Sequence, residues 1–213
     1  MAQPLNALTI MQDAPVIPVI VLNDVAHAVP MAEALVAGGI RVLEITLRTP
    51  QGLASIEAIA KAVPEAWVGV GTVRSAQDVQ DAVNAGARFA VSPGYTSALG
   101  QKCRDLHLPL LPGVATSSEI MTAQADGFNQ MKFFPAMQAG GIPMLKAWQG
   151  PFADVQFCPT GGINIGNAAE FLALSNVVCV GGSWLVPGQT LQEGNWQLIT
   201  KLALQACAMK QSQ

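Results

Sequence analysis

Short apolar runs recur along the chain, and a segment of helical character follows each of them. The runs predict strands over residues 15–22, 40–47, 67–73, 88–92, 108–111, 128–134, 155–158 and 177–180. Helices are predicted over residues 24–37, 50–62, 75–85, 96–106, 116–126, 142–148, 165–173 and 196–209, and a short helix over 5–11 precedes the first strand. Alternating strands and helices predict an α/β fold with a parallel sheet, and this number of units favours a closed (β/α)8 TIM barrel over an open doubly wound sheet.

The units follow one another without a linker rich in serine or charge, so we expect a single domain over residues 1–213. A weak internal repeat accompanies them. Ala37-Gly38-Gly39, Ala85-Gly86-Ala87 and Ala125-Asp126-Gly127 each close a predicted helix and open the next strand. Pro18 is an awkward residue, because it removes a backbone donor from the first predicted strand.

Composition excludes several classes of function. Hydrophobic residues make up 51% of the chain and charged residues 12%, which predicts a large core, yet no apolar run is long enough to span a bilayer. The first residues lack the basic segment of a secretory signal, so we expect a cytoplasmic protein. A net charge of −3 without a basic cluster argues against nucleic acid and anionic membranes as partners.

Metal and thiol chemistry are also disfavoured. The four cysteines form no CxxC pair, and the two histidines, His27 and His107, are isolated in the sequence. No metal-ligand spacing such as HExxH occurs. We therefore expect no metal site, no thiol nucleophile and no Ser-His-Asp triad.

Two charged residues lie inside predicted strands near their carboxyl ends, where barrel enzymes place their active sites. Glu44 lies in the second strand and Lys132 in the sixth. A buried lysine is costly unless it is paired or neutral, and a neutral amine is a nucleophile. The pair therefore indicates Schiff-base chemistry, with Lys132 attacking a substrate ketone and Glu44 moving protons. The alternatives are a snorkelling lysine and an ion pair that only fixes the strand register.

Other polar groups cluster at the same predicted barrel mouth. Arg48 could hold a carboxylate beside the ketone, although it could equally be a solvated loop cation. Thr72 could donate its hydroxyl to the same carboxylate, or be an ordinary threonine at a strand end. Two glycine turns, Thr160-Gly161-Gly162 and Gly181-Gly182-Ser183, follow the seventh and eighth strands, the usual phosphate-binding position in such barrels. Glycine also simply makes turns. The Gly-x-Gly-x-x-Gly pattern is absent, so we expect no nicotinamide cofactor.

These residues lie within motifs that resemble those of the 2-keto-3-deoxy-6-phosphogluconate (KDPG) aldolase and 4-hydroxy-2-oxoglutarate aldolase family. The resemblance covers almost the whole chain, in the family's order. The motifs are Leu43-Glu44-Ile45-Thr46-Leu47-Arg48-Thr49, Gly69-Val70-Gly71-Thr72-Val73, Ser92-Pro93-Gly94, Lys132-Phe133-Phe134-Pro135-Ala136, Phe157-Cys158-Pro159-Thr160-Gly161-Gly162 and Gly181-Gly182-Ser183-Trp184.

The resemblance implies a bacterial, metal-independent class I aldolase of the Entner–Doudoroff pathway. Such an enzyme cleaves the phosphorylated keto acid to pyruvate and glyceraldehyde 3-phosphate, often acts on 4-hydroxy-2-oxoglutarate as well, needs no cofactor and is typically a homotrimer. The alternative functions are a phosphosugar isomerase and a non-catalytic phosphosugar-binding barrel. Neither alternative would need a nucleophilic Lys132.

The family's functional positions carry over residue by residue. Its Schiff-base lysine falls on Lys132, its acid/base glutamate on Glu44, and its pyruvate-binding arginine and threonine on Arg48 and Thr72. Pocket-lining positions at the pyruvate end fall on Pro93 and Phe134, the position tied to stereochemical preference on Thr160, and the phosphate end on Gly161, Gly162, Gly182 and Ser183. The chain departs from the pattern at Met137, where glutamate is expected.

Overall fold

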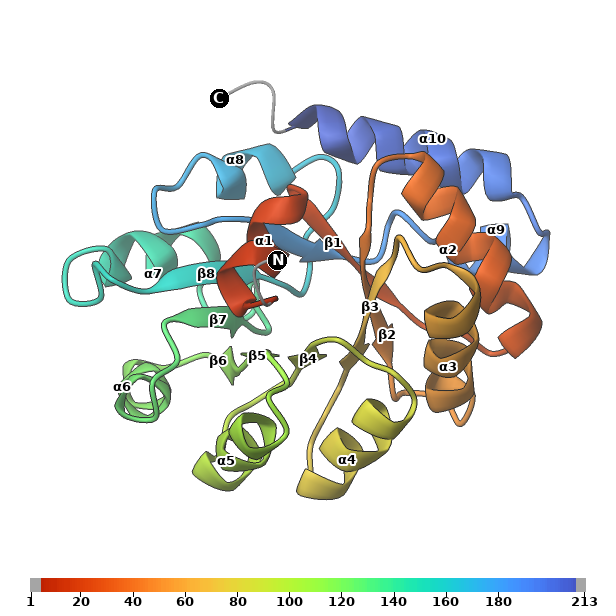
Figure 1. The fold of residues 1–213 in the computed structure, drawn as a ribbon. Helices are drawn as coiled ribbons and strands as arrows, with labels where there is room; N and C mark the ends of the chain where they lie inside the picture. Colours follow the sequence, from red (N-terminus) through yellow and green to blue (C-terminus); the bar gives the residue numbers. More distant parts are fainter. Residues whose placement is uncertain (1–4, 210–213) are drawn as a thin grey trace.

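Helices and strands alternate along the chain, as the sequence predicts (Figure 1). The computed structural model describes residues 5–209. The strands are β1 (Val16–Ile20), β2 (Val42–Thr46), β3 (Trp67–Gly71), β4 (Ala90–Val91), β5 (Leu110–Leu111), β6 (Gly113–Val114), β7 (Gln130–Phe133), β8 (Gln156–Pro159) and β9 (Val180–Gly182). The helices are α1 (Ala7–Asp13), the 3-10 helix η1 (Val25–His27), α2 (Ala28–Ala37), α3 (Gly52–Ala62), α4 (Ala76–Asn84), α5 (Ser97–Asp105), α6 (Ser117–Ala125), α7 (Gly141–Trp148), α8 (Ala168–Leu172), α9 (Gly188–Gln192) and α10 (Trp196–Ala208).

The strands form a curled parallel sheet in two pieces. One piece has the order β5-β4-β3-β2-β1-β9 and the other β6-β7-β8, and every strand pair is parallel. The pieces approach each other at both edges: only Pro112 separates β5 from β6, and an isolated bridge joins Thr160, after β8, to Gly181 of β9. The fold is therefore an α/β fold with a strongly curled parallel sheet.

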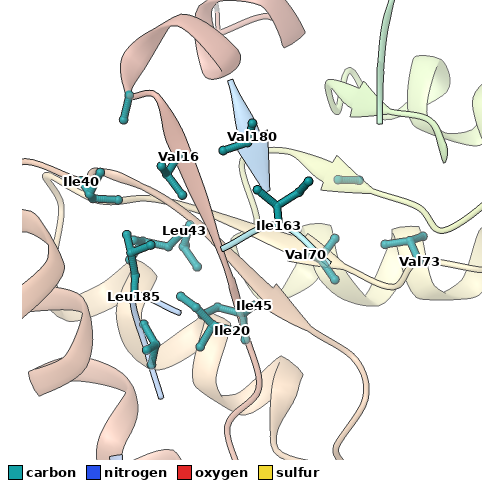
Figure 2. Packing of buried hydrophobic residues seen from close by; sticks show 14 of the residues in the cluster. Val16, Ile20, Ile40, Leu43, Ile45, Val70, Val73, Ile163, Val180 and Leu185 are labelled. Atoms are coloured by element: carbon teal, nitrogen blue, oxygen red, sulfur yellow. The ribbon is translucent and has the colours of Figure 1, made fainter. Parts of the chain in front are cut away.

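The outer face of the sheet packs against the surrounding helices, as the ribbon shows for α3 to α6 (Figure 1). Leu43 and Ile45 of β2 point to this side, and they join Val16, Ile20 and Val70 in the larger hydrophobic cluster (Figure 2). Alternate residues of a strand point to opposite faces, so Val42 and Glu44 point inward. This alternation is the reason that a glutamate can sit inside an otherwise apolar strand.

The inner face is filled at the amino-terminal ends of the strands. Ile10 and Met11 of α1 pack there with Ile17, Val42 and Phe89 in a second hydrophobic cluster. Helix α1 begins at Asn6, whose Oδ1 accepts a hydrogen bond from the Thr9 N–H at 2.9 Å. This second cluster, called the apolar plug below, fills the inner face at the amino-terminal ends of the strands, so polar side chains gather at the carboxyl ends.

Within residues 5–209, four helices (α2, α4, α6 and α9) end on a glycine in the left-handed region, and α5 ends on a histidine instead. Gly39, Gly86, Gly127 and Gly194 have φ of 89°, 90°, 89° and 62°, and His107 has φ of 52°. In each case the next residue's N–H returns to a carbonyl of the preceding helical turn, as Leu108 does to Cys103 at 2.9 Å. This is the Schellman arrangement, which favours glycine because glycine has no Cβ.

Several elements differ from the sequence prediction. The helix predicted over 24–37 begins as η1, with Asp24 accepting from the Ala26 N–H, and continues as α2. Helix α9 was not predicted, because five residues show too little periodicity to recognise. Pro18 lies inside β1 although it lacks a donor. The prediction that a turn begins at Gly181 is wrong, because Gly181 and Gly182 belong to β9.

Candidate active site

The inward faces of β2 and β7 bring a carboxylate and an amine together. Nζ of Lys132 lies 3.2 Å from Oε1 of Glu44, and their side chains are only 4% and 3% exposed. The two residues are 88 positions apart in the sequence, so the contact exists only in the folded chain. An amine paired with a carboxylate in this setting can pass its proton to the carboxylate and become a nucleophile.

Glycines in β3 provide the space for this pair. A Cβ at Gly71 would lie 2.3 Å from Oε1 of Glu44, which is far inside van der Waals contact. A Cβ at Gly69 would lie 2.4 Å from the ring of Phe89, within the apolar plug. Gly69 thus leaves space on the inner face of β3 for Phe89, and Gly71 leaves space for Glu44. Gly71 is a residue of the candidate site that the sequence analysis did not identify. Its signal was the glycine at every second position of a strand.

Lys132 also faces an aromatic ring. Its Nζ lies 5.1 Å from the centroid of the Phe134 ring, a distance at which a cation is attracted to the ring face. In the register of the sheet, Lys132 pairs with Gly113 of β6 and Cys158 of β8. Phe134 directly follows β7, so its ring contacts the amine at the carboxyl end of that strand.

Two threonine hydroxyls hold the turn that carries Arg48. Oγ1 of Thr46 donates to the Ile20 carbonyl at 2.8 Å, and Oγ1 of Thr49 donates to the Leu22 carbonyl. Both acceptors lie at the carboxyl end of β1 or just beyond it. The turn is thus fastened on each side of Arg48, whose side chain lines the pocket described next.

A pocket of about 240 Å³ opens at the carboxyl ends of the strands and gathers most of the residues proposed for substrate binding. Its lining includes Arg48, Phe134, Thr160, Gly161, Gly162, Gly182 and Ser183. Thr72 and Pro93 do not line it. Thr72 follows β3 with φ of 65°, and Pro93 borders a separate cavity beside Tyr95, with its backbone against Gly113.

The conformation of Thr72 is unusual. A left-handed φ in a β-branched residue costs about 1–3 kcal/mol and persists only where the surroundings enforce it. Its neighbours on both sides are fixed: the Gly71 carbonyl accepts from the Leu47 N–H, and the Val73 N–H donates to the Val91 carbonyl. Thr72 is therefore held beside Gly71 and Glu44 at the end of β3.

The two glycine segments of the pocket differ from each other. Gly161 and Gly162 form a turn with φ of 102° and 77°, which other residues rarely adopt. Gly181 and Gly182 are extended strand residues, and they are small for a different reason. A Cβ at Gly181 would lie 2.1 Å from Oγ1 of Thr160, and one at Gly182 would overlap the ring of Trp184.

The loop after β8 contains two asparagines and a methionine contact that sequence reasoning did not assign to the site. Asn167 donates to the Gly162 carbonyl at 3.0 Å. Met137 packs so close to Gly162 that a Cβ added at Gly162 would lie 2.6 Å from Cγ of Met137.

Within residues 5–209, no group of three or more His, Cys, Asp or Glu residues could hold a metal ion. Over the same residues, no helix is long and apolar enough to cross a membrane.

Comparison with known proteins gives a consistent result. The sequence model of the KDPG and KHG aldolases matches residues 8–202. The chain is 51% identical over 201 residues to the KHG/KDPG aldolase of Escherichia coli K12, covering 94% of each protein. It is 50% identical over 203 residues to the 2-dehydro-3-deoxy-phosphogluconate aldolase of Dickeya dadantii, covering 95% of each.

Among solved structures, the chain is similar to the KDPG aldolase of Legionella pneumophila, with a TM-score of 0.93 and 49% identity over 95% of this chain and 98% of that one. That crystal structure holds pyruvate as a covalent carbinolamine intermediate. The agreement of family model, relatives and structural neighbours shows that this chain is a carbon–carbon lyase and belongs to the KDPG and KHG aldolase family.

Proposed function

We propose that the chain is a class I aldolase that cleaves 2-keto-3-deoxy-6-phosphogluconate to pyruvate and glyceraldehyde 3-phosphate, and that it also cleaves 4-hydroxy-2-oxoglutarate. The observation that carries the proposal is the buried contact between Lys132 and Glu44, beside a pocket at the carboxyl ends of the strands. The substrate follows from the names of the relatives, and the carbinolamine in the Legionella enzyme is the first intermediate of Schiff-base chemistry.

The reaction begins with the lysine. Glu44 accepts a proton from the Lys132 ammonium, and the neutral amine attacks the C2 ketone of the substrate. The resulting carbinolamine loses water, with Glu44 returning a proton to the departing hydroxyl. The product is a protonated imine, in which the nitrogen draws electrons from the adjacent carbons.

Cleavage uses the same carboxylate a second time. Glu44 removes the proton of the C4 hydroxyl, the C3–C4 bond breaks, and its electron pair moves onto C3 as the imine becomes an enamine. The aldehyde departs with the phosphorylated half of the substrate. Glu44 then returns a proton to C3, and water hydrolyses the imine to release pyruvate and restore the amine.

The pyruvate half is proposed to bind beside the Lys132 amine, next to the 240 Å³ pocket; Arg48 and Phe134 line that pocket, whereas Lys132, Thr72 and Pro93 do not. Arg48 would pair with the carboxylate next to the ketone, and the Thr72 hydroxyl would donate to the same group. Pro93 and Phe134 would form apolar walls, and the Phe134 ring already lies over the Lys132 amine.

The phosphate half is proposed to bind at the glycine turn and at Ser183, which would donate through both its hydroxyl and its N–H. The N–H groups of Gly162 and Ser183 have no hydrogen-bond acceptor among the described residues, and both residues line the pocket together with Gly161. Unpaired backbone donors suit a phosphate. Gly182 leaves room beside them, and Thr160, at the junction of the two halves, would set the stereochemical preference at C4.

The proposal also covers the closure of the sheet, the location of the protein and its oligomeric state. The bridge from Thr160 to Gly181 and the short gap at Pro112 support a closed eight-stranded TIM barrel, in one domain over residues 1–213. A charged phosphorylated substrate does not cross membranes unaided, which supports a cytoplasmic location in the Entner–Doudoroff pathway. The resemblance to the aldolase family supports a homotrimer, and sedimentation equilibrium would measure its mass.

Borohydride trapping tests the function directly. Pyruvate plus borohydride should add one reduced adduct to the protein, on the peptide that carries Lys132. Lys132→Arg keeps a cation beside Glu44 but cannot form an imine, so it should lose both the adduct and the cleavage of the keto acid. Lys146→Arg is the matched control and should retain both. A folded Lys132→Arg protein with normal turnover would disprove the mechanism.

A further inference from the structure

One asparagine side chain ties together both ends of the turn that follows β8. Nδ2 of Asn167 donates to the Gly162 carbonyl at 3.0 Å, and its Oδ1 accepts from the Asn164 N–H at 2.8 Å. Asn164 in turn accepts from the Gly166 N–H at 2.8 Å, and this bond stays within the outer part of the loop. Asn167 is therefore the side chain that reaches back to the glycine turn.

The other carbonyls of the turn are held by the main chain. The N–H groups of Ala136 and Met137 donate to the carbonyls of Thr160 and Gly161, at 2.8 and 3.1 Å. Three successive carbonyls, from Thr160 to Gly162, are thus occupied. The first two are held by the backbone that follows β7, and the third is held by Asn167 alone among the described residues.

The geometry of the peptide bond links the orientation of each of these carbonyls to the orientation of the N–H group of the next residue. In a trans peptide the carbonyl of one residue and the N–H of the next point in opposite directions. Holding the three carbonyls therefore turns the N–H groups of Gly161, Gly162 and Ile163 to the opposite side. The N–H groups of Gly162 and Ile163 have no acceptor within residues 5–209, and both residues line the 240 Å³ pocket, whereas the Gly161 N–H faces Gly181 across the bridge to β9.

We propose that Asn167 is a positioning residue for the phosphate end of the site: it fixes the Gly162–Ile163 peptide so that the Ile163 N–H donates to the substrate phosphate. The inference rests on the proposed phosphate site at Gly161 and Gly162. Gly162 has φ of 77° and can rotate at little cost, so without Asn167 this peptide is free to turn its donor away.

A purely structural role for Asn167 fits the contacts less well. Asn167 occupies the N-cap position of α8, where asparagine usually accepts from an N–H of the first turn. Its side chain makes no such cap bond and reaches instead to Gly162, five residues earlier. The side chain therefore serves the glycine turn rather than the helix that it precedes.

The test compares a phosphorylated with an unphosphorylated substrate. In Asn167→Ala, kcat/KM for the phosphorylated keto acid should fall roughly tenfold, the factor for one lost charge-assisted hydrogen bond, mainly through KM. For 4-hydroxy-2-oxoglutarate it should stay within about twofold, because that substrate has no phosphate. Inhibition by inorganic phosphate should weaken together with the phosphorylated substrate. Asn164→Ala, which removes only the bond to Gly166, is the matched control and should change neither substrate.

The outcomes separate this inference from the phosphate site itself. Ser183→Ala probes that site independently of Asn167. If Ser183→Ala selectively loses activity on the phosphorylated substrate and Asn167→Ala does not, the role of Asn167 is overturned and the phosphate site is kept. If neither variant discriminates between the two substrates, both the role and the site are overturned. An equal loss on both substrates in Asn167→Ala also overturns the proposal, since it marks a structural role. If Asn167→Ala does not fold, Asn167→Leu, which keeps the volume, is measured in its place.

Discussion

Glu44 and Lys132 form a contact of 3.2 Å in which neither side chain is more than 4% exposed. Buried ion pairs contribute little to stability, because the cost of removing both charges from water offsets their attraction. Removing one partner is costly, since it leaves the other charge buried and unpaired. A pair of this kind is poorly explained by stability and well explained by chemistry that needs both groups.

Stability measurements on single and double variants test this interpretation. Lys132→Met should lower the free energy of unfolding by about 3 kcal/mol, because Glu44 then lacks its partner. The double variant Lys132→Met/Glu44→Met should recover most of that loss while remaining inactive. Urea denaturation gives both values. A double variant less stable than Lys132→Met would show that the pair itself stabilises the fold.

Gly71 leaves room for the Glu44 carboxylate, so Gly71→Ala should displace it. We expect cleavage to fall by about 100-fold or more, the range for a misplaced acid–base group. Gly150→Ala is the control, because a Cβ at Gly150 meets nothing within 4 Å. Steady-state kinetics together with circular dichroism distinguish a lost carboxylate position from a lost fold. Full activity in Gly71→Ala would mean that Glu44 does not need its observed position.

Thr49 fastens the turn that carries Arg48 to the end of β1. Thr49→Val keeps the shape but removes the donor to the Leu22 carbonyl, so Arg48 becomes less well placed. KM for the keto acid should rise by about fivefold with a smaller change in kcat, a loss of roughly 1 kcal/mol, and Thr49→Ser should restore it. Thr122→Val, on the exposed face of α6, is the control. A Thr49→Ser variant as poor as Thr49→Val would exclude the hydroxyl as the cause.

The sequence predicts that Glu44 and Lys132 face one another, and the fold shows this contact, for a physical reason. A charge within an apolar strand shows in the linear pattern, and the period of two places Glu44 and Lys132 on the inner face. The alternating glycines mark Gly71 as a position that needs a small residue, but only the fold shows that it makes room for Glu44. The role of Asn167 is invisible in the pattern, because it depends on a carbonyl that only the fold brings near. Gly181 was assigned to a turn because glycine suits both turns and strands, and here its small size serves the close approach of Thr160.

His107 occupies a left-handed position that Gly39, Gly86 and Gly127 fill at other helix ends. His107→Gly should therefore stabilise the protein by about 0.5–1 kcal/mol, since glycine adopts this φ without strain. Gly127→Ala should destabilise the protein by about 1 kcal/mol, because alanine is strained at this φ. A steric clash would not contribute, since a Cβ at Gly127 would meet nothing within 4 Å. Urea denaturation measures both changes. Two changes of the same sign would contradict the backbone explanation.

Tyr95 is the one tyrosine of the chain, and its hydroxyl donates to Oδ2 of Asp126 at 2.7 Å. Burial, together with the neighbouring Asp126 carboxylate, raises the pKa of Tyr95 to about 12. In the unfolded chain the phenol ionises near pH 10, roughly its usual value. The stabilising contribution is therefore complete below about pH 10 and is lost as the pH rises toward about 12.

Near-ultraviolet absorbance of tyrosinate follows this single group directly. In Asp126→Asn the midpoint should move down but stay above the value of the unfolded chain, because burial, the larger cause, remains. Tyr95→Phe should abolish the absorbance change and reduce the loss of stability between pH 10 and about 12. A midpoint near pH 10 in the native protein would mean that the phenol is solvated and that its bond to Asp126 does not form in solution.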